Sequence, residues 1–247
     1  MDRAAFTAMT GAKHAVELLG VTTNNLANAG TSGFREQLSF FRTAPLEGEG
    51  APTRAFAIAW TPYAKLAPGV LEATNNPYNA AIDGPGWFVA QRPDGSEGLT
   101  RSGTFRVVDG KLCFIDGKPV VGVTGPITVP QGGQIDFAED GTVNMKFPTN
   151  PVTIQALGRL KLVNPRPQSL VRDYDGLFVL ANDPNGKLRE VDSIKVRGRV
   201  LESSNVSTAN AMLQIITQSR AFDMNMKMVQ TVSENDKSAN SLLGRAR

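Results

Sequence analysis

Prolines and glycines divide the chain into two ends that can be helical and a middle that must turn often. All 15 prolines lie between residues 45 and 184, and residues 1–28 contain only two glycines. Residues 203–243 contain neither proline nor glycine. Because both residues interrupt helices, a long helix can form only at each end of the chain. We therefore predict an α+β fold in which a central β domain is inserted between two terminal helices.

Both ends repeat apolar or small residues at alternating spacings of three and four, which is typical of helices that pack along a seam. The N-terminal repeat consists of Ala5, Ala8, Ala12, Ala15, Leu19, Thr22 and Leu26. The C-terminal repeat consists of Met212, Ile215, Ser219, Phe222, Met226 and Val229, and it follows expected helix caps at residues 203–205. The first seam is mostly alanine, which buries little apolar area, so its helix depends on a partner.

We therefore predict a coiled-coil-like pairing of the two ends. In this pairing Ile215, Phe222 and Met226 pack against the alanine face of an N-terminal helix, either their own or that of a neighbouring copy. The same pattern also allows two ordinary amphipathic helices that cover one globular core.

The middle of the chain has the signature of antiparallel β structure. Asp-Gly pairs begin at residues 83, 94, 109, 116, 140 and 175, and an Asn-Gly pair begins at residue 185. These dipeptides favour hairpin turns because glycine, and less easily Asp or Asn, tolerates positive φ. Short runs of strand-forming residues lie between them, which predicts a mainly antiparallel sandwich or irregular barrel. We place the segment borders at 1–34 (helix and turn), 35–80 (extended connector), 81–197 (β domain) and 198–247 (C-terminal helix).

The composition excludes several classes of function. A single cysteine, Cys113, and a single histidine, His14, exclude an intrachain disulfide, multi-cysteine metal sites and most zinc or Ser-His-Asp chemistry. The net charge of +3 is spread along the chain, whereas a nucleic-acid surface needs a clustered basic patch. No apolar run approaches the ~18–20 residues of a membrane span, and the first residues lack the pattern of a cleaved secretory signal. We predict no catalytic residue, no cofactor and no metal site.

Two segments are too particular to be ordinary turns. Residues 24–35 read NNLANAGTSGFR, and residues 198–206 read GRVLESSNV. They closely resemble the N-N-L-A-N-x-x-T-x-G-F-[KR] and L-E-x-S-N-V motifs of the flagellar axial proteins, the family of rod and hook subunits. Further matches to this family lie at residues 81–88, 100–105, 218–222 and 225–228, so the resemblance runs in order along nearly the whole chain.

The resemblance implies a structural subunit without enzymatic activity. It implies a place in the proximal rod of the flagellar basal body, with the distal rod as the alternative. Subunits of this family stack helically around a central export channel and transmit torque from the motor to the hook. The implied partners are copies of the chain, other rod proteins and, during secretion, the flagellar type III export apparatus. The implied location is the periplasmic rod, reached without cleavage of a signal peptide.

Open helical assembly requires that different faces of each subunit meet. The seams and the two motifs together predict an assembly interface that consists of Ala5, Ala8, Ala12, Ala15, Leu19, Asn24, Asn25, Leu26, Asn28, Leu201, Glu202, Asn205, Met212, Ile215, Phe222, Met226 and Val229.

A second hypothesis comes from a different class of protein. A secreted, β-rich protein that binds or hydrolyses glycans would need an aromatic platform or a pair of carboxylates in a groove. Trp60 and Trp87 could contribute to such a platform, although core or interface positions suit them better in a chain with 7% aromatic residues.

Overall fold

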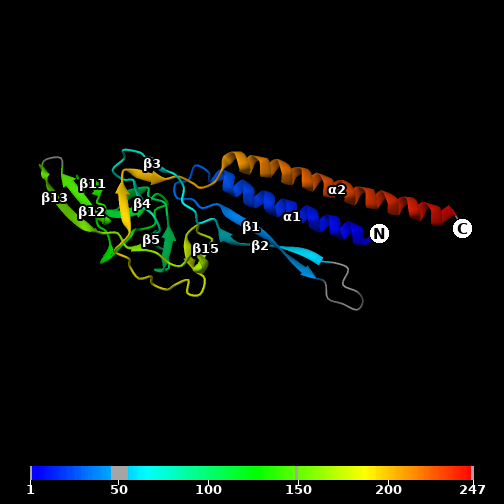
Figure 1. Ribbon diagram of the computed structural model, residues 1–247, viewed down its shortest axis with the longest axis horizontal. Coiled ribbons are helices and arrows are strands. Elements are labelled where there is room, and N and C mark those ends of the chain that lie inside the picture. Colours follow the sequence, from blue (N-terminus) through cyan, green and yellow to red (C-terminus); the bar gives the residue numbers. More distant parts are fainter. Residues whose placement is uncertain (1, 46–54, 148–149, 246–247) are drawn as a thin grey trace. The chain divides into compact units, whose positions relative to one another are not determined.

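The computed structural model describes residues 2–45, 55–147 and 150–245 (Figure 1). A helix stands at each end, α1 (Asp2–Ala27) and α2 (Thr208–Arg245), and every paired strand between them is antiparallel to its neighbour. The predicted α+β class, with terminal helices and a central antiparallel region, is therefore confirmed. The chain forms two compact units, which are described in turn: residues 1–27, 37–63 and 207–247 form the first, and residues 28–36 and 64–206 form the second.

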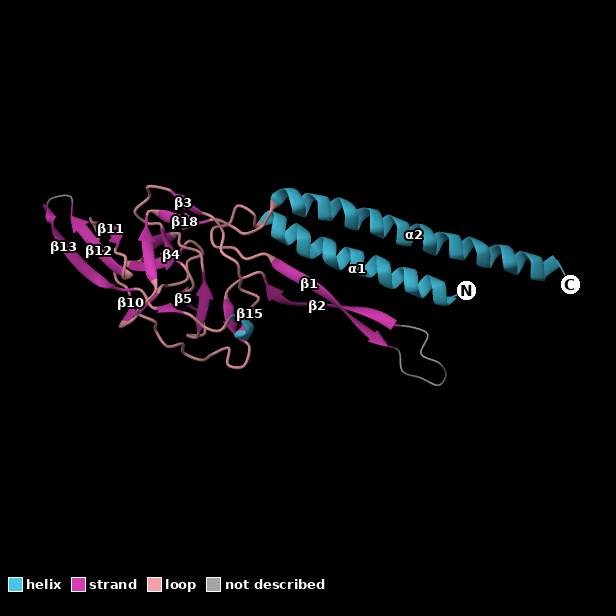
Figure 2. Ribbon diagram, in the orientation of Figure 1, coloured by secondary structure: helices cyan, strands magenta, loops and turns pink. Residues whose placement is uncertain are grey.

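In the first unit α1 and α2 lie side by side, and strands β1 (Gln37–Pro45) and β2 (Ala55–Ala64) form a two-stranded hairpin (Figure 2). These strands lie in the stretch that was expected to be an extended connector. Ser207 caps α2, because its Oγ accepts a hydrogen bond from the backbone N–H of Asn210 at 3.4 Å. The caps expected at residues 203–205 were therefore placed too early.

The seam on α1 is formed by its smallest residues. Ala8, Ala12, Ala15 and Thr22 are buried, and the predicted Ala5, Leu19 and Leu26 are partly buried. This spacing of three and four residues agrees with the prediction for the N-terminal helix.

The seam on α2 differs from the prediction at alternate positions. Ile215, Phe222 and Val229 are partly buried as expected, whereas Met212 and Met226 are 54% and 38% exposed. Ser219 is exposed as well. The positions assigned to these three residues are occupied instead by Ala211, Gln218 and Asn225.

Close packing on α1 explains this shift by one residue. A Cβ added to Gly11 would lie only 2.8 Å from Oδ1 of Asn225, so glycine makes the room that this side chain occupies. One turn of the seam is polar, where Oγ1 of Thr22 donates to Oε1 of Gln218 at 3.3 Å. Short or polar side chains therefore fit against the alanine and glycine surface, and the longer methionines lie on its flanks.

The second unit is built from short antiparallel strands. Its five-stranded sheet has the order β14 (Leu162–Val163), β5 (Trp87–Gln91), β6 (Glu97–Thr100), β16 (Phe178–Leu180) and β15 (Leu170–Arg172). A three-stranded sheet contains β11 (Gln134–Phe137), β12 (Thr142–Phe147) and β13 (Asn150–Arg159). Four strand pairs complete it: β3 (Leu71–Ala73) with β18 (Val200–Glu202), β4 (Ala80–Asp83) with β17 (Lys195–Gly198), β7 (Phe105–Val108) with β8 (Lys111–Phe114), and β9 (Val121–Gly122) with β10 (Gly125–Pro126). One 3₁₀ turn, η1 (Pro167–Ser169), precedes β15.

Most of the Asp-Gly pairs lie in hairpin turns as predicted, whereas Asp83-Gly84 follows β4, which pairs with β17, and Asn185-Gly186 lies between strands of different sheets. Those at residues 94, 109, 140 and 175 lie in the turns between β5 and β6, β7 and β8, β11 and β12, and β15 and β16. At the tightest of these turns Asp109 and Gly110 both have positive φ, at 50° and 71°. Two successive positive φ values are the mark of a type I′ hairpin, which twists in the same sense as the strands that it joins.

Aromatic side chains fill the core of the second unit. Phe105 lies at its centre, with ring centroids 5.5 Å from Phe88, 5.2 Å from Phe114 and 5.0 Å from Phe137. Cys113 is buried and reduced, as a small apolar residue would be.

A smaller cluster surrounds Trp87, which is buried with its ring centroid 4.8 Å from that of Phe178. Trp87 is therefore a core residue and is not available as an exposed platform for glycans. The side chain of Trp60 lies outside the described residues.

Truncating Phe105 should be costly. We expect Phe105→Ala to lower the free energy of unfolding by about 3–5 kcal/mol, because the cavity left in a packed core cannot fully collapse. Urea unfolding followed by tryptophan fluorescence measures this change. Val107→Ala, at an exposed position near the end of the same strand, is the control and should shift the value much less than Phe105→Ala does. Equal losses in the two variants would show that this cluster is not the core.

Candidate functional site

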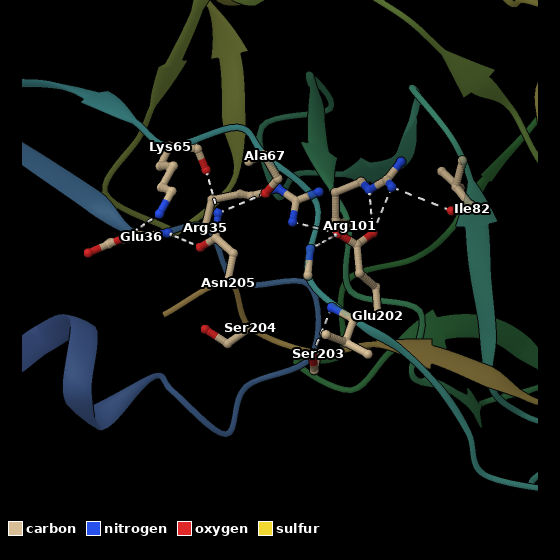
Figure 3. Close-up of polar contacts among 12 residues, drawn as sticks. Arg35, Glu36, Lys65, Ala67, Ile82, Arg101, Glu202, Ser203, Ser204 and Asn205 are labelled. Atoms are coloured by element: carbon tan, nitrogen blue, oxygen red, sulfur yellow. Dashed lines mark hydrogen bonds and ion pairs between the residues drawn. The ribbon is translucent and has the colours of Figure 1, made fainter. Parts of the chain in front are cut away.

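Three of the sequence motifs meet at a buried ionic cluster in the second unit. The carboxylate of Glu202 lies 2.5 Å from Nη1 of Arg35 and 2.7 Å from Nη2 of Arg101 (Figure 3). The three side chains are only 1%, 2% and 4% exposed, respectively. Arg35 ends the NNLANAGTSGFR segment, Arg101 belongs to the 100–105 match, and Glu202 belongs to the L-E-x-S-N-V match. Charged side chains this deeply buried are rare unless they are paired.

Glycines allow the backbone segments to approach one another at this cluster. Gly33 has φ +68°, and a Cβ there would lie 2.2 Å from the carbonyl carbon of Arg101. Its N–H donates to the carbonyl oxygen of Glu202 at 2.7 Å. Gly69 donates its N–H to Oε1 of Glu202 at 2.9 Å, and a Cβ there would lie 1.9 Å from the carbonyl oxygen of Ser203. Any larger residue at either position would push one of these segments away from Glu202.

Arg101 also donates hydrogen bonds to backbone carbonyl oxygens. Its Nη1 donates to the carbonyl oxygens of Gly84 at 3.0 Å and Gly86 at 2.6 Å. Burial lowers the pKa of Arg101, and the nearby carboxylate of Glu202 opposes that shift. An arginine in a protein nevertheless remains a cation. The cluster therefore contains fixed charges that the fold must neutralise internally.

Asn205 connects three segments beside this cluster. Its Nδ2 donates to the carbonyl oxygens of Lys65 at 2.7 Å and Ala67 at 2.8 Å, and its Oδ1 accepts from the N–H of Glu36 at 2.7 Å (Figure 3). The amide thus joins residues 36 and 65–67, which flank the paired strands β1 and β2, to the segment that precedes α2. Its side chain is engaged within the subunit, which differs from the expected helix cap.

Asn25 plays a similar part in the first unit. Its Nδ2 donates to the carbonyl oxygen of Gln37 at 2.9 Å, and its Oδ1 accepts from the N–H of the same residue at 2.9 Å. This two-bond contact fixes the start of β1 against the end of α1. Asn24 is exposed, and the Oδ1 of Asn28 accepts a hydrogen bond from Oγ1 of Thr31 at 3.2 Å.

The helix pair carries large apolar side chains on its outside. On α1 these are Phe6, Met9 and Val16, and Phe6 is 65% exposed. On α2 they are Met212, Leu213, Ile216, Met224 and Met228, and Leu213 is 62% exposed. We call these eight residues the outer apolar residues. Because a contiguous exposed apolar surface marks a site of interaction, these residues are candidates for contact with another molecule.

The predicted interface residues thus fall into groups with different environments. Ala8, Ala12 and Ala15 are buried and Ile215, Phe222 and Val229 are partly buried within the first unit, and Leu201 is partly buried in the second. Glu202, Asn25 and Asn205 make their contacts inside the chain, so their predicted role between subunits would have to be indirect.

Sequence reasoning missed Arg35 and Arg101 as functional residues. Each arginine lies in a glycine-containing motif, and this position could have marked it as a candidate for a structural or functional role.

Metal and membrane sites were also sought in the structure. Within the described residues, no group of three or more His, Cys, Asp or Glu side chains could hold a metal ion. Neither helix, over the residues described, is long and apolar enough to cross a membrane.

Comparison with known proteins identifies relatives along the whole chain. A family model described as the C-terminal region of flagellar basal body rod FlgEFG proteins matches residues 197–242, and one described as the D1 domain of flagellar hook protein FlgE/F/G matches residues 81–145. The chain is 42% identical to flagellar basal-body rod protein FlgF of Salmonella typhimurium and 41% identical to that of Escherichia coli; each alignment covers 98% of this chain and 99% of the relative. Flagellar basal-body rod protein FlgG of Agrobacterium fabrum is 29% identical over 94% of this chain and 96% of the relative.

Removing the charge of Glu202 should destabilise the second unit. We expect Glu202→Gln to lower the free energy of unfolding by about 3–5 kcal/mol, because two buried guanidiniums lose their shared counter-charge. Chemical denaturation of the purified chain measures the change. Glu72→Gln, in the adjacent strand β3 and exposed, is the control and should leave stability nearly unchanged. A Glu202→Gln protein as stable as the control would show that the cluster contributes little.

Proposed function

Because the chain belongs to the family of flagellar basal-body rod proteins, we propose that it is a structural subunit of the proximal part of the rod. The observation that carries the proposal is the 42% identity to a rod protein over 98% of the chain. The family is structural and not enzymatic. The lower identity of 29% to an FlgG protein disfavours the distal-rod alternative.

We propose that the terminal helices form the subunit contacts of the rod. In a helical array different faces of neighbouring subunits meet, so each helix needs apolar residues outside its own pair. The outer apolar residues meet this requirement on both α1 and α2. A helix that is apolar on more than one side is usually buried on more than one side. The assembled helices would then surround the export channel, with the β unit further out.

The seam supports a coiled-coil-like pairing in the rod. The inward residues of α2 recur at 211, 215, 218, 222, 225 and 229, which alternates spacings of four and three. This is the a/d spacing of a heptad repeat. We propose that the predicted seam residues of α1 take part either in this pairing or in the equivalent contact with a neighbouring copy.

A subunit that transmits torque must deform little under load. In the second unit Glu202 is bonded to Arg35, Arg101 and Gly69, and Arg101 is bonded in turn to Gly84 and Gly86. A force applied to any of these segments is therefore shared by the others. We propose that this cross-linking keeps the unit rigid while the rod rotates.

Membership of the rod-protein family also supports a proposal on how the chain is exported to the rod. We propose that the chain reaches the periplasmic rod through the flagellar type III export apparatus without cleavage, and that copies of itself and other rod proteins are its partners there.

A charge placed among the outer apolar residues should prevent assembly. We expect Leu213→Lys to abolish most swimming and to remove the chain from isolated basal bodies, because an ion buried without a partner loses its hydration. Circular dichroism of the purified variant should match that of the parent, since Leu213 is exposed in the subunit. Gln214→Lys adds the same charge at an exposed polar neighbour and should reduce swimming much less. Normal swimming of the Leu213→Lys strain would contradict the proposed contact.

The helices of an isolated subunit should be the least stable part of the chain. Their seam is mostly alanine, and helices that bury little area depend on packing for stability. We expect amide hydrogen exchange of a dilute monomer to be fast in α1 and α2 and slow in β5, β8 and β12. Assembled rods should protect both regions. A monomer that protects its helices as strongly as these strands would show that the rod grows by docking preformed helices.

A further inference from the structure

A cavity of about 320 Å³ lies beside the ionic cluster in the second unit. Arg35 and Arg101 line it, together with Trp87, Leu170, Pro165 and Pro167. Pro167 is exposed, so the cavity can be reached from outside the unit. Its size is at the lower end of the ~300–1,000 Å³ range of ligand pockets, which suits a side chain or a small molecule.

The guanidinium of Arg35 is incompletely satisfied at this cavity. The side chain is 2% exposed, and its Nη1 is paired with Glu202. Nε of Arg35 has no hydrogen-bond acceptor among the described residues. A buried donor without an acceptor is costly, and such groups in native proteins usually have a water, an ion or a ligand as partner.

The same region also has an excess of positive charge. Arg172 donates from Nη2 to the carbonyl oxygen of Arg35 at 2.9 Å, and its guanidinium lies 4.4 Å from the ring centroid of Phe34 and 5.0 Å from that of Phe178. Burial lowers the pKa of Arg172 to about 10, and its Nε has no acceptor among the described residues. Arg35 and Arg101 share the single carboxylate of Glu202, so the ionic cluster holds one more positive than negative charge, and Arg172 adds a third cation near the backbone of Arg35.

We propose that this cavity receives a carboxylate side chain from a neighbouring rod subunit, an inference that rests on the proposed function. A second carboxylate would neutralise the excess charge and supply an acceptor to Nε of Arg35. A carboxylate matches the fork geometry of a guanidinium, and hydrogen bonds between the two ions are stronger than those between neutral groups. The proline, leucine and tryptophan walls would contact the apolar part of the entering side chain and its neighbours.

Two short peptides test the chemistry of the cavity. The probes are acetyl-leucyl-glutamyl amide and acetyl-leucyl-glutaminyl amide, which differ only in charge. Their binding to the full chain carrying Trp60→Phe is followed by the fluorescence of Trp87, which lines the cavity. We expect saturable binding of the glutamyl peptide, and binding of the glutaminyl peptide to be weaker by about tenfold, as the loss of a charge-assisted hydrogen bond implies. No saturation, or equal affinities, would overturn the proposal.

Variants of the cavity separate binding from folding. Arg35→Met should abolish binding, and Pro167→Asp should do so from the exposed rim while leaving the ionic cluster intact. Arg189→Met removes an exposed arginine outside the cavity and should leave the affinity unchanged. Pro167→Asp therefore remains informative if Arg35→Met does not fold. An unchanged affinity of the Pro167→Asp chain would exclude this cavity as the site.

The source of the carboxylate is tested in the rod itself. A photoreactive amino acid is placed at residue 167 in cells, basal bodies are isolated after irradiation, and the cross-linked peptides are identified by mass spectrometry. We expect a peptide of a neighbouring rod subunit that contains Asp or Glu. A cross-link to a segment without an acidic residue, or no cross-link between subunits, would overturn the proposal while leaving the place of the chain in the rod intact. Absence of the chain from basal bodies would instead contradict the proposed function.

Discussion

The buried carboxylate of Glu202 is the interaction on which the second unit depends. It lies at the end of β18 and holds two arginines that come from segments far away in the sequence, one of them 101 residues distant. Moving these charges out of water is expensive, and their attraction compensates only when the geometry is good and the remaining donors are satisfied. The close approaches at Gly33 and Gly69 exist because they allow that geometry. The ion pairs of Glu202 therefore require the close backbone approaches at these two glycines.

Side-chain amides solve a related problem where the chain passes between its two units. The chain changes unit four times, after residues 27, 36, 63 and 206. Backbone at such places lies near the ends of helices and strands, yet its buried polar groups still need partners. Asn25 satisfies both backbone groups of Gln37, and Asn205 satisfies the N–H of Glu36 and the carbonyl oxygens of Lys65 and Ala67. An asparagine can do this because its amide both donates and accepts.

Features that depend on neighbouring residues could be predicted from the sequence, whereas contacts between residues far apart in the sequence could not. Helix ends and hairpins depend on local conformational preferences, so the proline-free ends and the Asp-Gly turns could be located from the sequence. The side of α2 that faces α1 is fixed by Gly11 on the other helix, which gives room to Asn225 and leaves Met226 outside. Hydrophobic pattern alone favoured the methionine. The pairing of Arg35 and Arg101 with Glu202 leaves no periodic trace, so motif matches marked the segments without showing that they meet.

The two units satisfy the hydrophobic effect in opposite ways. The second unit buries its large aromatic residues, such as Phe88, Phe105 and Phe114, so its hydrophobic core forms within a single subunit. The first unit places alanine inside and leaves large side chains such as Phe6 and Leu213 outside. Burial stabilises in proportion to apolar area, so this arrangement leaves most of the available stabilisation unused in one subunit. That remaining apolar area becomes useful only when another surface covers it, which makes assembly the step that completes the folding of the helices.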